Sequence, residues 1–142
     1  MGSFASRLNR GHWYGWLFWG AAAVFFLYEY FLRVLPSVIL KDLGTAFKAT
    51  PVELSAAVAV YLWVYSPLQL IVGALFDRYG AKFLVSGAAL ICGGGGLLFA
   101  MADGLTGVAL AQALIGTGSA FAFVGAVYVA TVWFPPSRLA LI

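Results

Sequence analysis

The sequence predicts an all-α membrane protein with four transmembrane helices. Hydrophobic residues make up 63% of its 142 residues and charged residues only 9%, and the mean hydropathy is +0.98, which is outside the range of soluble domains. A helix that crosses a hydrocarbon core of about 30 Å needs roughly 20 apolar residues. Four segments meet this length: 13–40, 52–76, 83–101 and 105–134. Residues 1–142 therefore form one helical unit with short connections, the longest being 41–51.

The first span carries polar residues in the stretch LYEYFLRVLPSVIL, residues 27–40. Glu29, Arg33 and Ser37 recur every four residues and so lie on one side of a helix, with Tyr30 at the edge of that side. Ionisable groups at membrane depth normally face a water-filled cavity, a partner charge or a substrate. Alternatively, Glu29 and Arg33 form only an internal salt bridge or extend to the interface. We favour the functional interpretation because such groups are rare in membrane spans.

A one-sided polar pattern also follows the second span. Tyr65, Gln69, Gly73 and Asp77 are spaced four residues apart, so their side chains share one face of the helix. Gln69 is an uncharged residue inside the span whose amide can form hydrogen bonds. This polar face leads directly into the junction that follows the second span.

The junction between the second and third spans reads GALFDRYGAK. Gly73 would allow a neighbouring helix to approach closely, and Gly80 would permit a tight turn. Asp77 lies at a helix C-terminus, where a carboxylate is unfavourable against the helix dipole unless it is paired. Arg78 and Lys82 add positive charge beside the membrane. The combination indicates a specialised loop.

Glycines inside the third and fourth spans favour close helix packing. The clearest cases are the run 93–96 and the pair Gly116 and Gly118. A nucleotide-binding loop is excluded because no strand precedes these glycines and no terminal GK[ST] follows them. Gln112 precedes Gly116 by one turn and is a candidate for hydrogen bonding, either between helices or to a substrate.

The junction resembles the signature loop of the major facilitator superfamily, G-x-x-x-D-R-x-G-R-[RK], which lies between the second and third helices of that family. The match covers Gly73, Asp77, Arg78, Gly80 and Lys82. It departs at Ala81, where a basic residue is usual.

Three further stretches are similar to this superfamily in the expected order. Tyr30, Arg33 and the PSV of 36–38 resemble the first helix of the organic-anion and sugar-phosphate permease branches. Residues 115–120 and 133–138 resemble the fourth helix and its cytoplasmic exit. Many members carry an arginine where this sequence has Gln112, which puts any proton-coupling role of that position in doubt.

The resemblance implies that the chain is the first part of an N-terminal six-helix bundle, lacking the C-terminal helices of a longer parent. It also implies secondary active transport of a small polar solute by alternating access across the inner cell membrane. The solute would be an organic anion, a phosphorylated metabolite or an amino acid, coupled to a proton or a counter-anion. The expected substrate-binding residues are Arg33, which would hold an anionic group, and Glu29, Tyr30, Gln69 and Gln112. The loop from Gly73 to Lys82 would act as a gate.

The distribution of Lys and Arg predicts that both termini are cytoplasmic, because positive charges are retained on that side. Five would lie inside and two outside: Arg7, Arg10, Arg78, Lys82 and Arg138 against Lys41 and Lys48. The basic residues thus fit a bilayer as partner, and no nucleic acid is expected.

No metal, cofactor or catalytic activity is expected. His12 is the only histidine and Cys92 the only cysteine, so neither has a second ligand at metal spacing. Paired carboxylates are also missing from the five acidic residues, and an enzyme is therefore not predicted.

Two alternatives to the transporter fragment remain open. A self-contained four-helix exporter could act as a homo-oligomer in which Glu29 of one subunit pairs with Arg33 of another. Alternatively, the protein could be a membrane remnant or interaction protein that transports nothing.

Overall fold

The computed structural model describes the backbone of residues 2–133 and the side chains of residues 14–131. Within this part the chain is entirely helical. The helices are α1 (Gly2–Val38), α2 (Leu40–Phe47), α3 (Pro51–Tyr79), α4 (Ala81–Ala100) and α5 (Leu105–Trp133). Four helices are long and apolar enough to cross a membrane: α3, α4, α5 and the Tyr14–Val38 part of α1. The predicted fold class is confirmed.

The connection expected over 41–51 differs from the prediction because it contains α2. A turn at Ile39 ends α1 at Val38, two residues before the expected bound. Asp42 lies in the first turn of α2, where a carboxylate is favoured by the helix dipole. α2 ends at Lys48, whose φ of 51° is left-handed. α2 has eight residues, far fewer than the roughly 20 apolar residues by which membrane spans are identified in a sequence.

Both ends of α3 have local sequence causes. At its start, Thr50 and Glu53 form a capping box, in which the Thr50 N–H donates to Glu53 Oε2 at 2.8 Å and Thr50 Oγ1 accepts from the Glu53 N–H at 3.3 Å. Pro51 occupies the first helical position, where its missing N–H has no consequence. At the other end, Gly80 adopts a φ of 78°, which a glycine tolerates without a Cβ clash. α4 therefore begins directly after α3.

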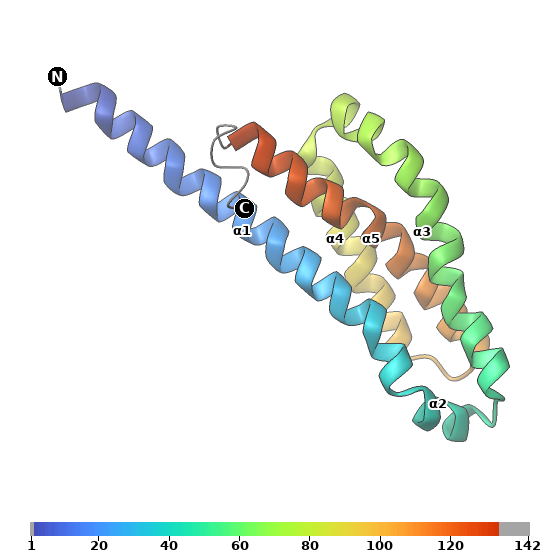
Figure 1. Ribbon diagram of the computed structural model, residues 1–142. Coiled ribbons are helices and arrows are strands. Elements are labelled where there is room, and N and C mark those ends of the chain that lie inside the picture. Colours follow the sequence, from blue (N-terminus) through green and yellow to red (C-terminus); the bar gives the residue numbers. More distant parts are fainter. Residues whose placement is uncertain (1, 134–142) are drawn as a thin grey trace.

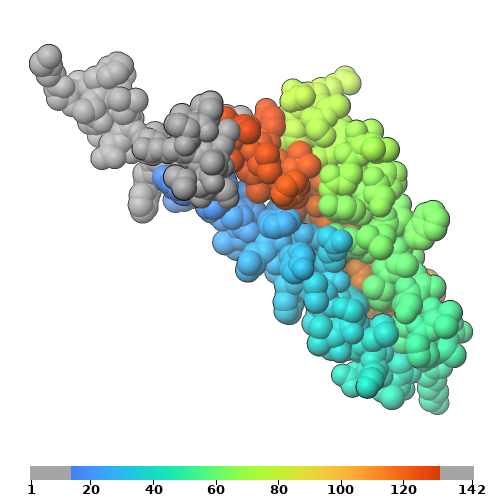
Figure 2. All heavy atoms as spheres, in the orientation of Figure 1, coloured from blue at the N-terminus to red at the C-terminus, as the bar shows by residue number. Residues whose placement is uncertain are grey.

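The central helix of the bundle is α5, which packs against α1, α3 and α4, whereas α3 and α4 touch each other only slightly. Figure 1 shows the start of α1, the α3–α4 turn and the end of α5 at one end of the bundle. The opposite end carries α2 and the α4–α5 connection. In Figure 2, α1 and α3 form most of the visible face, with α5 between them.

Small residues of α5 make this central position possible. Ala111, Ala120 and Ala122 are at most 1% exposed, so neighbouring backbones can approach closely. The main core cluster joins all four long helices and consists of Phe25, Leu32, Tyr61, Ala88, Cys92, Ile115 and Ala122. Large apolar side chains such as Trp63 and Leu70 lie on the outer surface, as expected of helices that face lipid.

Candidate substrate site

Glu29 lies inside the bundle and is only 3% exposed. The Tyr61 hydroxyl of α3 donates a hydrogen bond of 2.7 Å to Glu29 Oε1. Arg33, four residues later, is exposed, and within the described residues neither side chain forms an ion pair. An internal Glu29–Arg33 salt bridge is therefore wrong, because Tyr61 supplies the buried hydrogen bond that Glu29 requires. The polar side of α1 is divided between an inward carboxyl and an outward guanidinium.

Arg33 is positioned by aromatic rings of α3. Its Cζ lies 5.4 Å from the Tyr61 ring centroid and 5.7 Å from that of Tyr65. The two rings stack with centroids 5.4 Å apart and planes inclined by 15°. A cation over aromatic faces at such distances is attracted to them. Because no acceptor among the described residues takes the guanidinium N–H groups, these donors are available to an anion.

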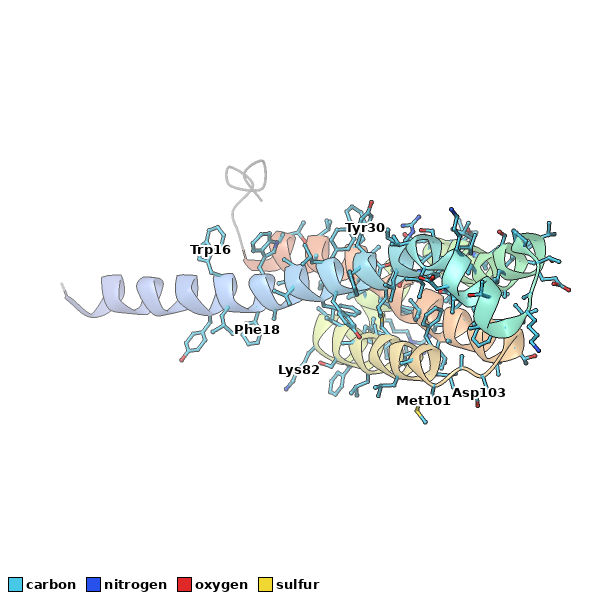
Figure 3. The ribbon with its side chains drawn as sticks, turned by 90° about the horizontal axis from the view of Figure 1, so that it is seen from below. Trp16, Phe18, Tyr30, Lys82, Met101 and Asp103 are labelled. Carbon is cyan, nitrogen blue, oxygen red and sulfur yellow. The ribbon has the colours of Figure 1, made fainter. Side chains whose placement is uncertain are left out.

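Tyr30 is on the outer surface of α1 and is 56% exposed. Figure 3 shows it on the side of the bundle opposite α4, whose ends are marked by Lys82 and Met101. Gln69 instead faces α5, because its Nε2 donates to the Ala120 carbonyl oxygen at 3.3 Å. In this conformation Gln69 joins two helices.

Gln112 is the buried polar group that most requires an explanation. It is 1% exposed, and neither its Nε2 nor its Oε1 has a hydrogen-bond partner within the described residues. Leaving a buried donor or acceptor unpaired costs about 1–3 kcal/mol. Buried polar groups without partners commonly mark a functional site or an ordered water.

The residues of the signature junction are largely exposed. Asp77, Arg78 and Lys82 are accessible at the α3–α4 turn, and Arg78 Cζ lies 5.5 Å from the Tyr79 ring centroid. A Cβ added at Gly73 would meet no atom within 4 Å. The close helix approach expected there is absent among the described helices.

Gly116 and Gly118 lie at the closest helix contacts of α5. A Cβ at Gly116 would be 2.7 Å from the Tyr61 carbonyl oxygen, and one at Gly118 would be 2.6 Å from the Ala88 carbonyl oxygen. In the run 93–96, a Cβ added at Gly95 would lie 2.8 Å from Ile115 Cγ1, whereas a Cβ added at Gly94 would meet no atom within 4 Å. The glycines of α5 thus set its distance to α3 and α4.

A separate apolar groove of about 300 Å³ runs between α1 and α5. No charged side chain lines it, so it does not suit a polar solute. Its lining residues are Trp19, Ala23, Phe26, Phe123, Ala126, Val127, Ala130 and Thr131.

The sequence interpretation missed Tyr61. Its available signal was the spacing of Tyr61 and Tyr65, two tyrosines one helical turn apart inside an apolar span. Within the described residues, no group of His, Cys, Asp and Glu side chains could hold a metal ion. The side chains of Arg7, Arg10 and His12, and the stretch 133–138, lie outside the described side chains.

Four long apolar helices with polar groups between them are typical of a multi-pass membrane protein. Residues 17–142 match the family model described as Major Facilitator Superfamily. The chain therefore belongs to the major facilitator superfamily. Members of this superfamily bind small-molecule substrates in a lipid bilayer and are generally not enzymes.

Two curated relatives are similar to this chain. It is 34% identical over 113 residues to the uncharacterized transporter YybO of Bacillus subtilis (strain 168), which covers 80% of this chain and 26% of that protein. It is 32% identical over 103 residues to the inner membrane transport protein YajR of Escherichia coli (strain K12), covering 71% of this chain and 22% of that protein. The chain thus spans about a quarter of the length of these relatives. No solved structure matches it.

Proposed function

We propose that this chain is the N-terminal part of a secondary active transporter that moves a small polar solute across the inner cell membrane by alternating access. The observation that carries the proposal is the Arg33 guanidinium, exposed on two tyrosine rings with no acidic partner among the described residues. The family membership and the greater length of both relatives support a longer transporter. The solute is an organic anion, a phosphorylated metabolite or an amino acid, because each carries a group that a guanidinium binds.

Arg33 binds the anionic group of the solute in this proposal. Tyr30 borders the same site from α1, and the unpartnered amide of Gln112 offers a donor and an acceptor once the bundle changes conformation. Gln69 and Glu29 contribute to the shape of the cavity through their bonds to Ala120 and Tyr61. The coupling ion is a proton or a counter-anion.

The homo-oligomeric exporter is less well supported by the geometry. That hypothesis relied on Glu29 of one subunit pairing with Arg33 of another. Glu29 is instead 3% exposed and bonded to Tyr61 of its own chain, so it is not accessible to a second subunit. Measurement of uptake distinguishes the transporter from the other alternative, a membrane remnant or interaction protein that transports nothing.

The test replaces Arg33 with alanine in the complete transporter. We expect Arg33→Ala to abolish uptake while membrane insertion stays intact, because removing the guanidinium removes the charge-assisted hydrogen bonds to the solute. Uptake is measured in cells with a panel of radiolabelled organic anions, sugar phosphates and amino acids. Lys41→Ala removes an equal charge from the exposed surface of α2 and serves as the control. Retained uptake in Arg33→Ala would rule out this residue as the anion site.

A further inference from the structure

Tyr61 connects the buried carboxyl of Glu29 to the exposed guanidinium of Arg33. Its hydroxyl donates to Glu29 at 2.7 Å, and its ring lies 5.4 Å from Arg33 Cζ. The same ring stacks on Tyr65. Tyr61 itself is 3% exposed, so both its polar end and its ring faces are in contact with protein.

These contacts restrict the Tyr61 ring in complementary ways. The hydrogen bond to Glu29 holds the hydroxyl end, which limits rotation of the side chain, and the stacked Tyr65 ring limits its tilt. Glu29 is itself held in the bundle interior. An arginine has several rotatable bonds and loses conformational entropy when it is fixed, so a rigid ring beside it lowers the entropy that substrate binding must remove.

We propose that Glu29 and Tyr61 are positioning residues that hold Arg33 in its binding geometry, and that Glu29 does not contact the solute. The identity of Arg33 as the anion ligand rests on the proposed function above, whereas the positioning does not depend on transport. In this arrangement Glu29 is required as a hydrogen-bond acceptor for Tyr61. Its negative charge is not required.

Polar groups of several helices surround the Glu29–Tyr61 pair. From α3 Glu29 meets Tyr61, and the buried Cys92 of α4 belongs to the same core cluster as Tyr61. Arg33 follows on its own helix. The only titratable side chain of α5 over its described length is Tyr128, which packs on Phe76. The Ser119 hydroxyl of α5 is also buried near Tyr61 but forms no hydrogen bond within the described residues, so the acceptor for the Tyr61 hydroxyl is Glu29.

Modification of arginine by phenylglyoxal tests this inference without a transport substrate. The nitrogens of the neutral guanidine attack the carbonyl carbons of the reagent, so a guanidinium whose protonated form is stabilised by aromatic rings reacts more slowly than a free one. The purified complete protein in lipid nanodiscs is treated with phenylglyoxal, and the modification of Arg33 is followed by mass spectrometry. The rate at Arg78, an exposed arginine at the α3–α4 turn, provides an internal reference for folding and reagent activity.

The variants separate the acceptor from the charge. Glu29→Gln keeps an oxygen that accepts from the Tyr61 hydroxyl, and we expect its ratio of Arg33 to Arg78 rates to equal that of the unchanged protein. Glu29→Leu removes the acceptor and should raise the ratio about two- to tenfold, the range that corresponds to cation–π stabilisation. Tyr61→Leu should give a similar increase. Tyr61→Phe keeps the ring and loses the hydroxyl, so its ratio should lie between these values.

Two results would overturn the positioning role. An equal increase in Glu29→Gln and Glu29→Leu would show that the charge of Glu29 acts, and unchanged ratios in both Tyr61 variants would show that Tyr61 does not hold Arg33. Failure of the proposed function appears separately, as uptake that survives Arg33→Ala. If Arg33 is both the ligand and held by Tyr61, Glu29→Leu raises the KM for uptake more than it lowers the maximal rate.

Discussion

At the scale of single residues, Glu29 and Arg33 show how different two environments one helical turn apart can be. Residues at i and i+4 share a helix side, yet Glu29 is buried and Arg33 is exposed. A short carboxyl reaches the interior hydroxyl of Tyr61, while the long arginine stem carries its head over the ring to the surface. Charge spacing alone does not distinguish this from a salt bridge.

Gly118 gives a stability prediction at the same scale. We expect Gly118→Val to destabilise the bundle by about 1–3 kcal/mol or more, the usual result of overpacking, because a Cβ there would lie 2.6 Å from the Ala88 backbone oxygen. Thermal unfolding in detergent measures the effect. Gly94→Val is the matched control, since a Cβ at Gly94 meets nothing within 4 Å. Equal destabilisation by both substitutions would contradict the close α4–α5 contact.

At the scale of elements, α3 carries most of the polar contacts that link the bundle. One helix presents Tyr61 and Tyr65 to Arg33, Gln69 to the backbone of α5, and Asp77 at its end. The capping box at Thr50 and the turn at Gly80 determine where α3 begins and ends. One helix therefore carries residues of the candidate site and the first part of the signature junction.

Asp77 at the end of α3 gives a kinetic prediction. In the complete transporter we expect Asp77→Asn to slow turnover more than it weakens substrate binding, because the proposed gate acts on conformational exchange and not on the solute. Substrate affinity and uptake rate are measured on the same preparation. Asp103→Asn, which changes an exposed acid in the α4–α5 connection, should leave both unchanged. An equal loss of affinity and rate in Asp77→Asn would argue against the gate.

At the scale of the whole molecule, α5 organises the bundle and the helices alternate in direction between two ends. Figure 1 shows that the start of α1, the α3–α4 turn and the end of α5 share one end. The α3–α4 turn, which carries Arg78 and Lys82, therefore faces the same end of the bundle as the start of α1 (Figure 1). That this end is cytoplasmic stays a prediction from the distribution of positive charges.

The orientation can be tested with the two ends of α4. We expect an impermeant maleimide to label Asp103→Cys and not Lys82→Cys in intact cells, and to label both after permeabilisation. Figure 3 shows these residues at opposite ends of α4. The native Cys92 is fully buried and should give little background in the unchanged protein. Labelling of Lys82→Cys alone would reverse the proposed orientation.

Much of the architecture could be predicted from sequence because membrane spans depend on length and polarity, which are local properties. The four expected spans agree closely with α1, α3, α4 and α5 where the structure describes them. α2 was missed because eight residues with mixed polarity look like a loop. Arg33, Glu29 and Gln69 could be selected as candidate site residues from their polarity. Their partners could not, because these lie on other helices: Tyr61 is 28 residues from Arg33 in sequence, and Ala120 is 51 residues from Gln69.

The sequence by itself determined the membrane class, the number of long helices, the family junction and the set of polar residues, since composition and local spacing are enough to specify these. Only the tertiary structure decided that Glu29 bonds Tyr61, that Arg33 lies over two tyrosines, and that Gln112 is buried without a partner among the described residues. The physical reason is that these features depend on the register and separation of helices, which the packing of small residues along α5 determines.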